Sequence, residues 1–170
     1  MTNKPREVAL PDHSRLAPLY PGADLADAYA VAVPPGSSAD VAELARAVLA
    51  EPPGWVKPLM AARDGIMRWF GVKTVHKIVE GSARRGRETI GFFPVRERLD
   101  DEVVLGEDDR HLDFRSSFLV RQDAAGKREL VWVTVVHCRN RLGRLYLAAI
   151  GPFHRMIVPA YLARLTRGAR

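Results

Sequence analysis

The chain has 170 residues, of which 47% are hydrophobic and 27% charged, and its formal net charge is +6. This length fits one domain with a single core, and the composition excludes a disordered chain. No uncharged run approaches the roughly 20 residues of a membrane-spanning helix, so we predict no membrane span and expect a cytoplasmic protein of bacterial type. The densest basic cluster, Arg84, Arg85 and Arg87, has no interleaved aromatic residue, so we do not predict a nucleic-acid partner.

The N-terminal residues 1–24 contain four prolines and no sustained periodicity, which predicts an arm rather than a separate domain. We place a single domain at residues 25–170. Its first strand is predicted at Asp27–Val33, where apolar residues alternate. The strand should end at Pro34-Pro35-Gly36, which a central strand does not tolerate.

Two short helices are predicted after this strand. The first spans Ala39–Ala50, with Ser37 or Ser38 as its N-terminal cap and its apolar residues at helical spacing. The second spans Trp55–Phe70 and begins directly after Pro52-Pro53-Gly54. Both helices therefore offer one apolar face to a core.

After residue 70 the hydrophobic period changes from helical to alternating, which is typical of strands. Six strands are predicted: Val75–Glu80, Thr89–Glu97, Glu102–Gly106, Arg110–Arg121, Glu129–Cys138 and Gly143–Ile150. The segments between them are rich in turn-forming residues. Strands joined by short turns pair antiparallel, because a parallel pair needs a long crossover.

The chain closes with a predicted helix at Gly151–Gly168, with Pro152 suited to its first turn. Its buried stripe is predicted to comprise Phe153, Met156, Ile157, Ala160, Tyr161 and Leu165. Pro159 falls in the interior of this helix, where it removes a backbone donor and should bend the helix around a concave sheet. In the alternative interpretation, residues 153–158 are not helical and a short helix begins at Pro159.

This order of elements predicts an α+β fold in which helices cover one face of a curved antiparallel sheet of about seven strands. With the long C-terminal helix in the concavity and the two short helices at one end, the predicted arrangement is the helix-grip fold of the START-like, pollen-allergen superfamily. A ferredoxin-like fold is the alternative. That fold requires strands and helices to alternate twice, which this chain does not show.

Five stretches of the chain also resemble the bacterial family of unknown function number 2867. They are Asp27–Val31, Gly54–Met60, Leu105–Ser117, Asn140–Tyr146 and Pro152–Arg155. One departure is Arg63-Asp64, where the resemblance leads us to expect Arg-Asn. The resemblance implies the START-like fold and no established activity.

Some members of that family follow a nucleotide-binding, reductase-like domain. This chain has no glycine-rich strand-turn-helix fingerprint, so we predict no dinucleotide binding and no cofactor.

The stretch HLDFRSS carries the most polar candidate site, since His111, Asp113 and Arg115 fall at spacing two and share one face of a strand. If that face meets water, these residues would form ion pairs with one another or with neighbouring strands. If it lines a cavity, Asp113 could orient His111 as a general base while Arg115 holds an anionic group. In both cases we predict Asp113 and Arg115 to be ion-paired within the fold.

Three further residues are candidates for ligand contact. Trp55 could line a pocket, and Arg63 lies on the second helix. His154 opens the last helix, where a cation is unfavourable, so it should either face solvent or pair with acids around Asp113 or with a ligand.

His111 and Asp113 could ligate a metal together with either His137 or His154. Nothing in the sequence fixes the third ligand, so we predict no metal site. A serine-histidine-aspartate triad with Ser117 lacks the turn that such a nucleophile needs.

Three functions fit these observations. The first is binding of a small, largely apolar ligand between the C-terminal helix and the sheet. The second is an enzyme that acts on a small molecule with His111, Asp113 and Arg115. The third is a non-catalytic interaction module accessory to a reductase-like partner.

The run Leu130–Val136 is apolar on both faces, so the arm or a second subunit should cover it, and a homodimer is a candidate assembly. The single cysteine, Cys138, lies at the end of this apolar stretch and is predicted to be an inert, buried thiol.

Overall fold

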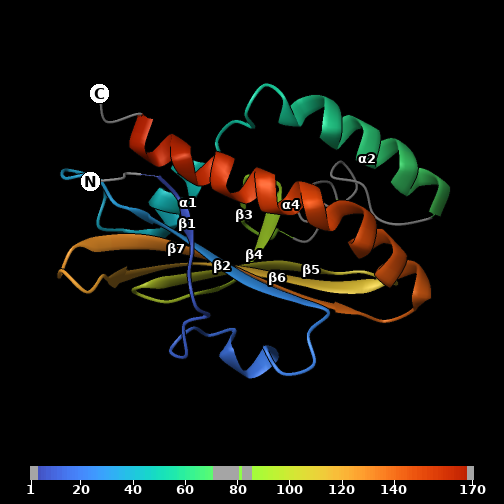
Figure 1. Ribbon diagram of the computed structural model, residues 1–170, viewed down its shortest axis with the longest axis horizontal. Helices are drawn as coiled ribbons and strands as arrows, with labels where there is room; N and C mark the ends of the chain where they lie inside the picture. The colour runs from blue at the N-terminus through green and yellow to red at the C-terminus, as the bar shows by residue number, and fades with distance from the viewer. Residues whose placement is uncertain (1–3, 71–80, 82–85, 168–170) are drawn as a thin grey trace.

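A seven-stranded antiparallel sheet forms the centre of the protein, with helices over one face and the N-terminal arm under the other (Figure 1). The computed structural model describes residues 4–70, 81 and 86–167. The strands are β1 (Arg6–Glu7), β2 (Leu25–Ala32), β3 (Thr89–Ile90), β4 (Phe93–Arg98), β5 (Glu102–Asp108), β6 (Leu112–Gln122) and β7 (Arg128–Cys138). The helices in this part of the chain are the 3-10 turn η1 (Ala17–Leu19), α1 (Val41–Leu49), α2 (Val56–Phe70) and α4 (Arg141–Arg167). The predicted α+β class and the strand number are confirmed.

The strand order is β1-β2-β7-β6-β5-β4-β3, and all neighbours pair antiparallel, as the short connections predict. The hairpin between β6 and β7 shows how local chemistry sets this order. The carboxylate of Asp123 accepts hydrogen bonds from the N–H groups of Ala125 and Lys127, and Gly126 adopts a φ of 73°. An aspartate and a glycine in these places close a tight turn at little conformational cost.

Helix α1 begins at Asp40, whose carboxylate accepts a hydrogen bond of 2.8 Å from the N–H of Ala42. The prediction that Ser37 or Ser38 is the cap is wrong, because the hydroxyl of Ser38 instead accepts from the N–H of Asp40 and supports the cap residue. The apolar stripe of this helix is buried as predicted and consists of Val41, Leu44, Ala45, Val48 and Leu49.

The sheet carries an apolar layer on each face. Toward the helices, the rings of Phe118 and Trp132 lie 4.7 Å apart, and Tyr161 of α4 meets Trp132 edge-on at 6.1 Å. The opposite layer contains Leu16, Ala28, Ala30, Val104, Leu119, Val131, Val133 and Val135. Phe118 and its neighbour Leu119 therefore mark the two faces of β6, the helix face and the arm face.

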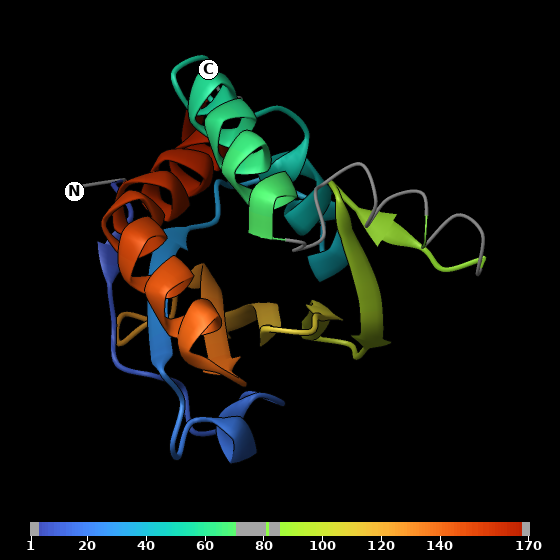
Figure 2. The same ribbon diagram turned by 90° about the vertical axis from the view of Figure 1, so that its right-hand side faces the viewer.

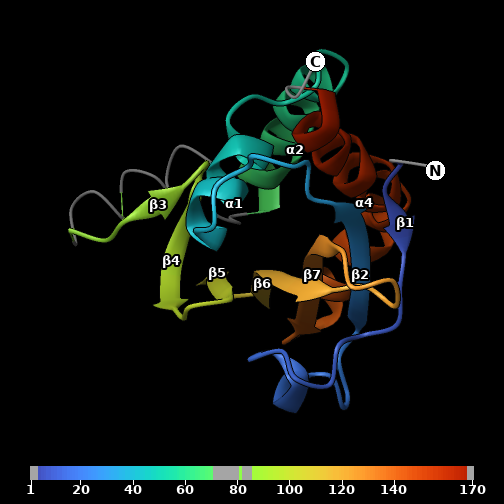
Figure 3. The same ribbon diagram turned by 90° about the vertical axis from the view of Figure 1, so that its left-hand side faces the viewer.

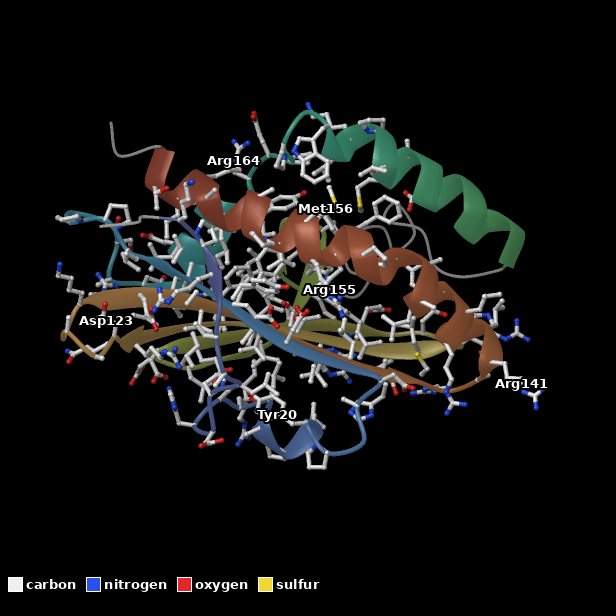
Figure 4. All side chains as sticks on the ribbon, in the orientation of Figure 1. Tyr20, Asp123, Arg141, Arg155, Met156 and Arg164 are labelled. Carbon is white, nitrogen blue, oxygen red and sulfur yellow. The ribbon has the colours of Figure 1, made fainter. Side chains whose placement is uncertain are left out.

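The arm covers that second layer. Leu16 is fully buried in it, and Tyr20, which lies on the side of the sheet away from α4, donates from its hydroxyl to the carbonyl of Pro11 (Figure 4). The two apolar faces of β7 are thus covered by helices and by the arm. The sequence left two candidates for covering this strand, the arm and a second subunit. The structure shows that the arm covers it.

Two buried carboxylates hold the arm to the sheet. Glu102 accepts a hydrogen bond of 2.6 Å from the hydroxyl of Ser14 and one of 2.7 Å from the N–H of Arg15. Glu129 pairs with Arg6 of the arm at 2.6 Å and with Arg121 at 2.8 Å. A buried carboxylate is costly unless it is paired, so these contacts tie the arm to a defined position.

The predicted strand at Gly143–Ile150 is wrong, because these residues form the first part of α4. Over so short a run, the spacing of the apolar residues fits a strand as well as a helix. A helix forms because Asn140 caps it, accepting a hydrogen bond from the N–H of Gly143. The predicted strand Thr89–Glu97 is divided into β3 and β4 by Gly91, which has a φ of 62°. The predicted strand Val75–Glu80 lies outside the described residues.

The buried stripe predicted for the last helix is partly wrong. Tyr161 is buried, but Phe153 is 43% exposed and Met156 57% exposed, and Met156 lies on the side of α4 away from the sheet (Figure 4). The residues that do face the sheet include His154 and Val158.

Both interior prolines lie within one helix. Pro152 is not in the first turn, and residues 153–158 are helical, so a short helix starting at Pro159 is excluded. The two prolines are seven residues apart and therefore lie on nearly the same side of the helix. Each removes a donor and crowds the carbonyl four residues earlier, so we still expect a bend toward the sheet. No helix among the described residues is long and apolar enough to cross a membrane.

Candidate ligand site

The polar residues of HLDFRSS lie on the arm face of the sheet, away from α4. Phe118 belongs to the helix-face core and Leu119 to the opposite layer, so the alternation of β6 places Asp113, Arg115 and Ser117 on the arm face. A ligand between α4 and the sheet would instead meet the alternate residues of β6, such as Phe114 and Ser116.

Asp113 and Arg115 are both ion-paired, as predicted, but with partners other than each other. Asp113 receives two hydrogen bonds from Arg139, at 2.8 Å and 3.0 Å. Arg115 reaches Asp108 across β5 at 2.5 Å, and Asp108 also pairs with Arg96. The predicted orientation of His111 by Asp113 does not occur, since the carboxylate is occupied by Arg139.

Gly106 makes room for the side chain of Arg115. A Cβ atom at this glycine would lie 2.4 Å from the carbonyl oxygen of Phe114 and 2.9 Å from Cδ of Arg115. Desolvation tends to raise the pKa of Asp108, but the hydrogen bonds and charges of Arg115 and Arg96 outweigh it and lower that pKa to about 2. This cluster is a structural ion network on a partly exposed face.

We predict that Arg115→Ala lowers the free energy of unfolding at neutral pH by more than the ~1 kcal/mol of a surface pair, because the lost contacts include the packed stem. The folded pKa of Asp108 lies below its unfolded value, so its stabilisation is present above pH 3.8 and is lost as the pH falls toward 2. The difference between wild type and variant should therefore shrink over that range in urea titrations. Arg144→Ala is the control, since among the described residues the ion pair of Arg144 is a long, exposed one with Asp24.

His111 lies at the junction between β6 and the start of α4. Asn140 accepts from the N–H of Gly143 through Oδ1 at 3.0 Å, so its Nδ2 is the donor to Nδ1 of His111, also at 3.0 Å. A Cβ atom at Gly143 would lie 2.2 Å from the carbonyl oxygen of His111. His111 and Asn140 therefore fix the position at which α4 leaves the sheet.

The remaining candidates lie in separate places. Trp55 precedes α2 and is largely exposed. The side chain of Arg63 lies outside the described residues. His137 donates from Nε2 to the carbonyl oxygen of Leu19, 2.8 Å away, and so contacts the arm. Within the described part of the chain, no three potential ligands gather as a metal site would require.

Cys138 ends β7, and its thiol is half-buried. Burial, with a smaller contribution from the charge of Asp24, raises the pKa of the thiol to about 11. A thiol that stays protonated at neutral pH is a poor nucleophile, which agrees with the inert role predicted from the sequence.

His154 and Asp27 form the most buried polar pair under α4. Nε2 of His154 lies 3.0 Å and 3.1 Å from the two carboxylate oxygens of Asp27, and the side chains are only 16% and 9% exposed. His154 shares the inward side of α4 with Val158 and Tyr161, at spacings of four and seven residues. His154 thus has an acidic partner, Asp27, rather than an acid around Asp113, and it lies inside α4 rather than at the start of a helix.

A row of polar residues continues from Asp27 across the sheet. Thr134 of β7 is the direct cross-strand partner of Asp27 on one side and of Ser116 on the other. Ser116 accepts from the indole N–H of Trp132 at 2.6 Å and donates to the carbonyl of Val133 at 3.3 Å. Thr134 is 1% exposed, and its hydroxyl has no hydrogen-bond partner in the part of the chain that the structure describes.

The two halves of α4 pack differently on the sheet. Val158, Tyr161 and Leu162 in the second half are buried in the core. In the first half, Leu147 and Ile150 share the inward side with His154 but are only half-buried. Figure 2 views the molecule from the end at which α4 begins, with α2 at the top and the β4 end of the sheet on the right. The first half of α4 therefore presents incompletely covered apolar surface around a buried polar group.

Sequence reasoning found His154 but missed Asp27, Thr134 and Ser116. A signal for Asp27 was available, because it is in phase with Tyr29 and Val31, the core-facing residues of the first strand. An acidic residue at a core-facing position predicts a specific partner. Thr134 and Ser116 gave no comparable signal, since short hydroxyl side chains are common in strands.

Comparison with known proteins gives one result. The model of a family described as protein of unknown function (DUF2867) matches residues 19–161, which is most of the chain and extends from the arm to the second half of α4. No curated protein and no solved structure matches the chain. The match covers strands β2 to β7, α1, α2 and both residues of the His154–Asp27 pair, so the chain belongs to the DUF2867 family of proteins of unknown function.

Proposed function

We propose that the protein binds a small, largely apolar ligand between the first half of α4 and the sheet, in a fold of the helix-grip, START-like kind. The observation that carries the proposal is the contrast within α4, whose inward apolar residues are buried after residue 157 but only half-buried before it. Incompletely covered apolar surface with a few buried polar groups is the usual character of a small-molecule site.

The ion network of HLDFRSS gives less support to the enzyme hypothesis. Asp113 and Arg115 are occupied by partners within the fold, and His111 is engaged by Asn140. A general base must reach the proton that it abstracts, and these three residues lie on the face that the arm packs against. We therefore place the site on the other face, at His154 and Asp27.

A co-purifying molecule is the expected result of native mass spectrometry on freshly prepared protein. In addition, apolar compounds should raise the melting temperature in a thermal-shift screen, because a ligand that binds only the folded state stabilises it by mass action, by about 2.7 kcal/mol at a concentration of 100 Kd. The absence of both a bound mass and any shift across a broad apolar panel would contradict the proposal.

A pair of tryptophan variants tests the location. Ile150→Trp fills the half-buried inward surface, so ligand-induced shifts should disappear while the protein stays folded. Leu145→Trp is the matched control, because Leu145 lies in the same helix half and is exposed. Equal ligand responses in both variants would place the site elsewhere.

A further inference from the structure

The buried hydroxyl of Thr134 points to a chemical group that the protein alone does not supply. On the helix face of β7 it stands between Asp27, which His154 engages, and Ser116, which Trp132 and Val133 engage. Of these three neighbouring polar side chains, Thr134 is the one whose oxygen has no partner among the described residues. A buried polar group without a partner costs free energy, so natural proteins seldom retain one without a reason.

The surroundings of Thr134 make a packing explanation insufficient. β7 uses valine at positions 131, 133, 135 and 136, and all four side chains are buried. Valine has nearly the shape of threonine and carries no hydroxyl to satisfy. A valine at position 134 would therefore fill the same space at a lower cost, unless the hydroxyl has a partner when a ligand is bound.

The imidazole of His154 supplies the second half of a recognition site. Nε2 of His154 faces the carboxylate of Asp27, which leaves Nδ1 as the other hydrogen-bonding atom of the ring. Thr134 is the cross-strand neighbour of Asp27, so the Cβ atoms of these two residues lie on the order of 5 Å apart. The orphaned hydroxyl of Thr134 therefore lies directly beside the His154–Asp27 pair on the helix face of the sheet.

We propose that the ligand is a largely apolar alcohol, whose hydroxyl accepts a hydrogen bond from Thr134 and donates one to Nδ1 of His154. This inference rests on the proposed function and specifies its ligand class. A hydroxyl both donates and accepts, as the two protein groups require. A carboxylate has no proton to donate to Nδ1 and would add a second negative charge beside Asp27, while an ether or a hydrocarbon satisfies one partner or neither.

The test compares three probes with the same alkyl chain: dodecanol, dodecanoate and dodecyl methyl ether. Dissociation constants are measured by isothermal titration for the full chain and for Thr134→Val, with Thr134→Ser as the variant that keeps the hydroxyl. Wild type should bind dodecanol best. Thr134→Val should weaken the binding of dodecanol and of the ether alike by about tenfold, the equivalent of one hydrogen bond, because both oxygens accept from Thr134.

A second orphaned hydroxyl provides the control. Ser117 is fully buried and has no partner in the described residues, like Thr134, but it lies on the arm face of β6. Ser117→Ala should change none of the three dissociation constants. Thr134→Val and Ser117→Ala should both raise the melting temperature of the unliganded protein, which shows that both variants fold.

The outcomes separate the two proposals. A wild-type preference for dodecanol over the ether, with weaker binding of both in Thr134→Val and unchanged binding in Thr134→Ser, would support the alcohol site. Equal binding of the three probes by wild type, or unchanged dodecanol binding in Thr134→Val, would overturn the alcohol site while an apolar site under α4 stands. Failure of every probe to bind wild-type protein, with no co-purifying molecule, would overturn both.

Discussion

Replacement of Leu162 with alanine is expected to lower the free energy of unfolding by about 2–5 kcal/mol, the range found for leucine truncations in close-packed cores. Leu162 has no exposed surface and lies in the part of α4 that packs against the helix-face core. The change removes apolar contact and leaves a cavity in the close-packed core that also contains Trp132 and Tyr161. Urea denaturation followed by circular dichroism measures this loss.

Leu145→Ala is the control for that experiment. The residue type, the helix and the substitution are the same, but Leu145 is 65% exposed, so its change should stay within about 0.5 kcal/mol. Similar losses for the two variants would show that the assigned inward side of α4 is incorrect.

Gly143→Ala is expected to destabilise the protein by about 3 kcal/mol, although glycine to alanine within a helix normally stabilises it by up to about 1 kcal/mol. The reason is a clash with backbone, since the new Cβ would lie 2.2 Å from the carbonyl oxygen of His111. A backbone atom cannot rotate away as a side chain can. The start of α4 must therefore shift, and the bonds of Asn140 to Gly143 and to His111 shift with it.

Gly65→Ala in α2 provides the opposite expectation. A Cβ at Gly65 would meet no atom within 4 Å, so this substitution should be neutral or stabilising. Thermal unfolding of both variants gives the sign of each effect. A stabilised Gly143→Ala would mean that α4 does not approach β6 at His111 in solution.

Much of the sheet could be predicted because strand periodicity and turn residues act locally. The strands β5, β6 and β7 and the helices α1 and α2 begin and end within a few residues of their predicted limits. Their antiparallel pairing follows from the short connections alone. The β2–β7 pair and the burial of Glu102 and Glu129 depend on contacts between distant parts of the chain, which no local pattern contains.

The start of α4 could not be predicted from the same signals. Residues 143–150 contain apolar side chains at spacings that fit a strand as well as a helix, and Gly151-Pro152 resembles a boundary. The tertiary contact of Gly143 with His111 and the capping by Asn140 decide in favour of a helix. Because the helix was expected to begin about ten residues later, its buried stripe was assigned partly to the wrong side.

The candidate site illustrates a general limit of strand alternation. Spacing two correctly places Asp113 and Arg115 on one face of β6, but it does not say which face the helices cover. The structure shows that this face meets the arm, while the less conspicuous residues Ser116 and Thr134 face α4. His154 was singled out because it was expected near a helix start, where an unpaired cation is unfavourable. The structure places it in the interior of α4, so that argument does not explain its pairing with Asp27.

The two outermost strands have a consequence for the behaviour of the protein at high concentration. β1 and β3 are each only two residues long, and they flank the sheet on opposite sides (Figure 3). Without β1, the eight-residue β2 would expose a row of unpaired backbone groups to other molecules, which is the usual template for aggregation. At the other edge, Pro94 of β4 offers no N–H group for pairing. The arm therefore does more than cover an apolar face, because Arg6 and Glu7 also present a short, charged edge that discourages one molecule from adding a strand to the next.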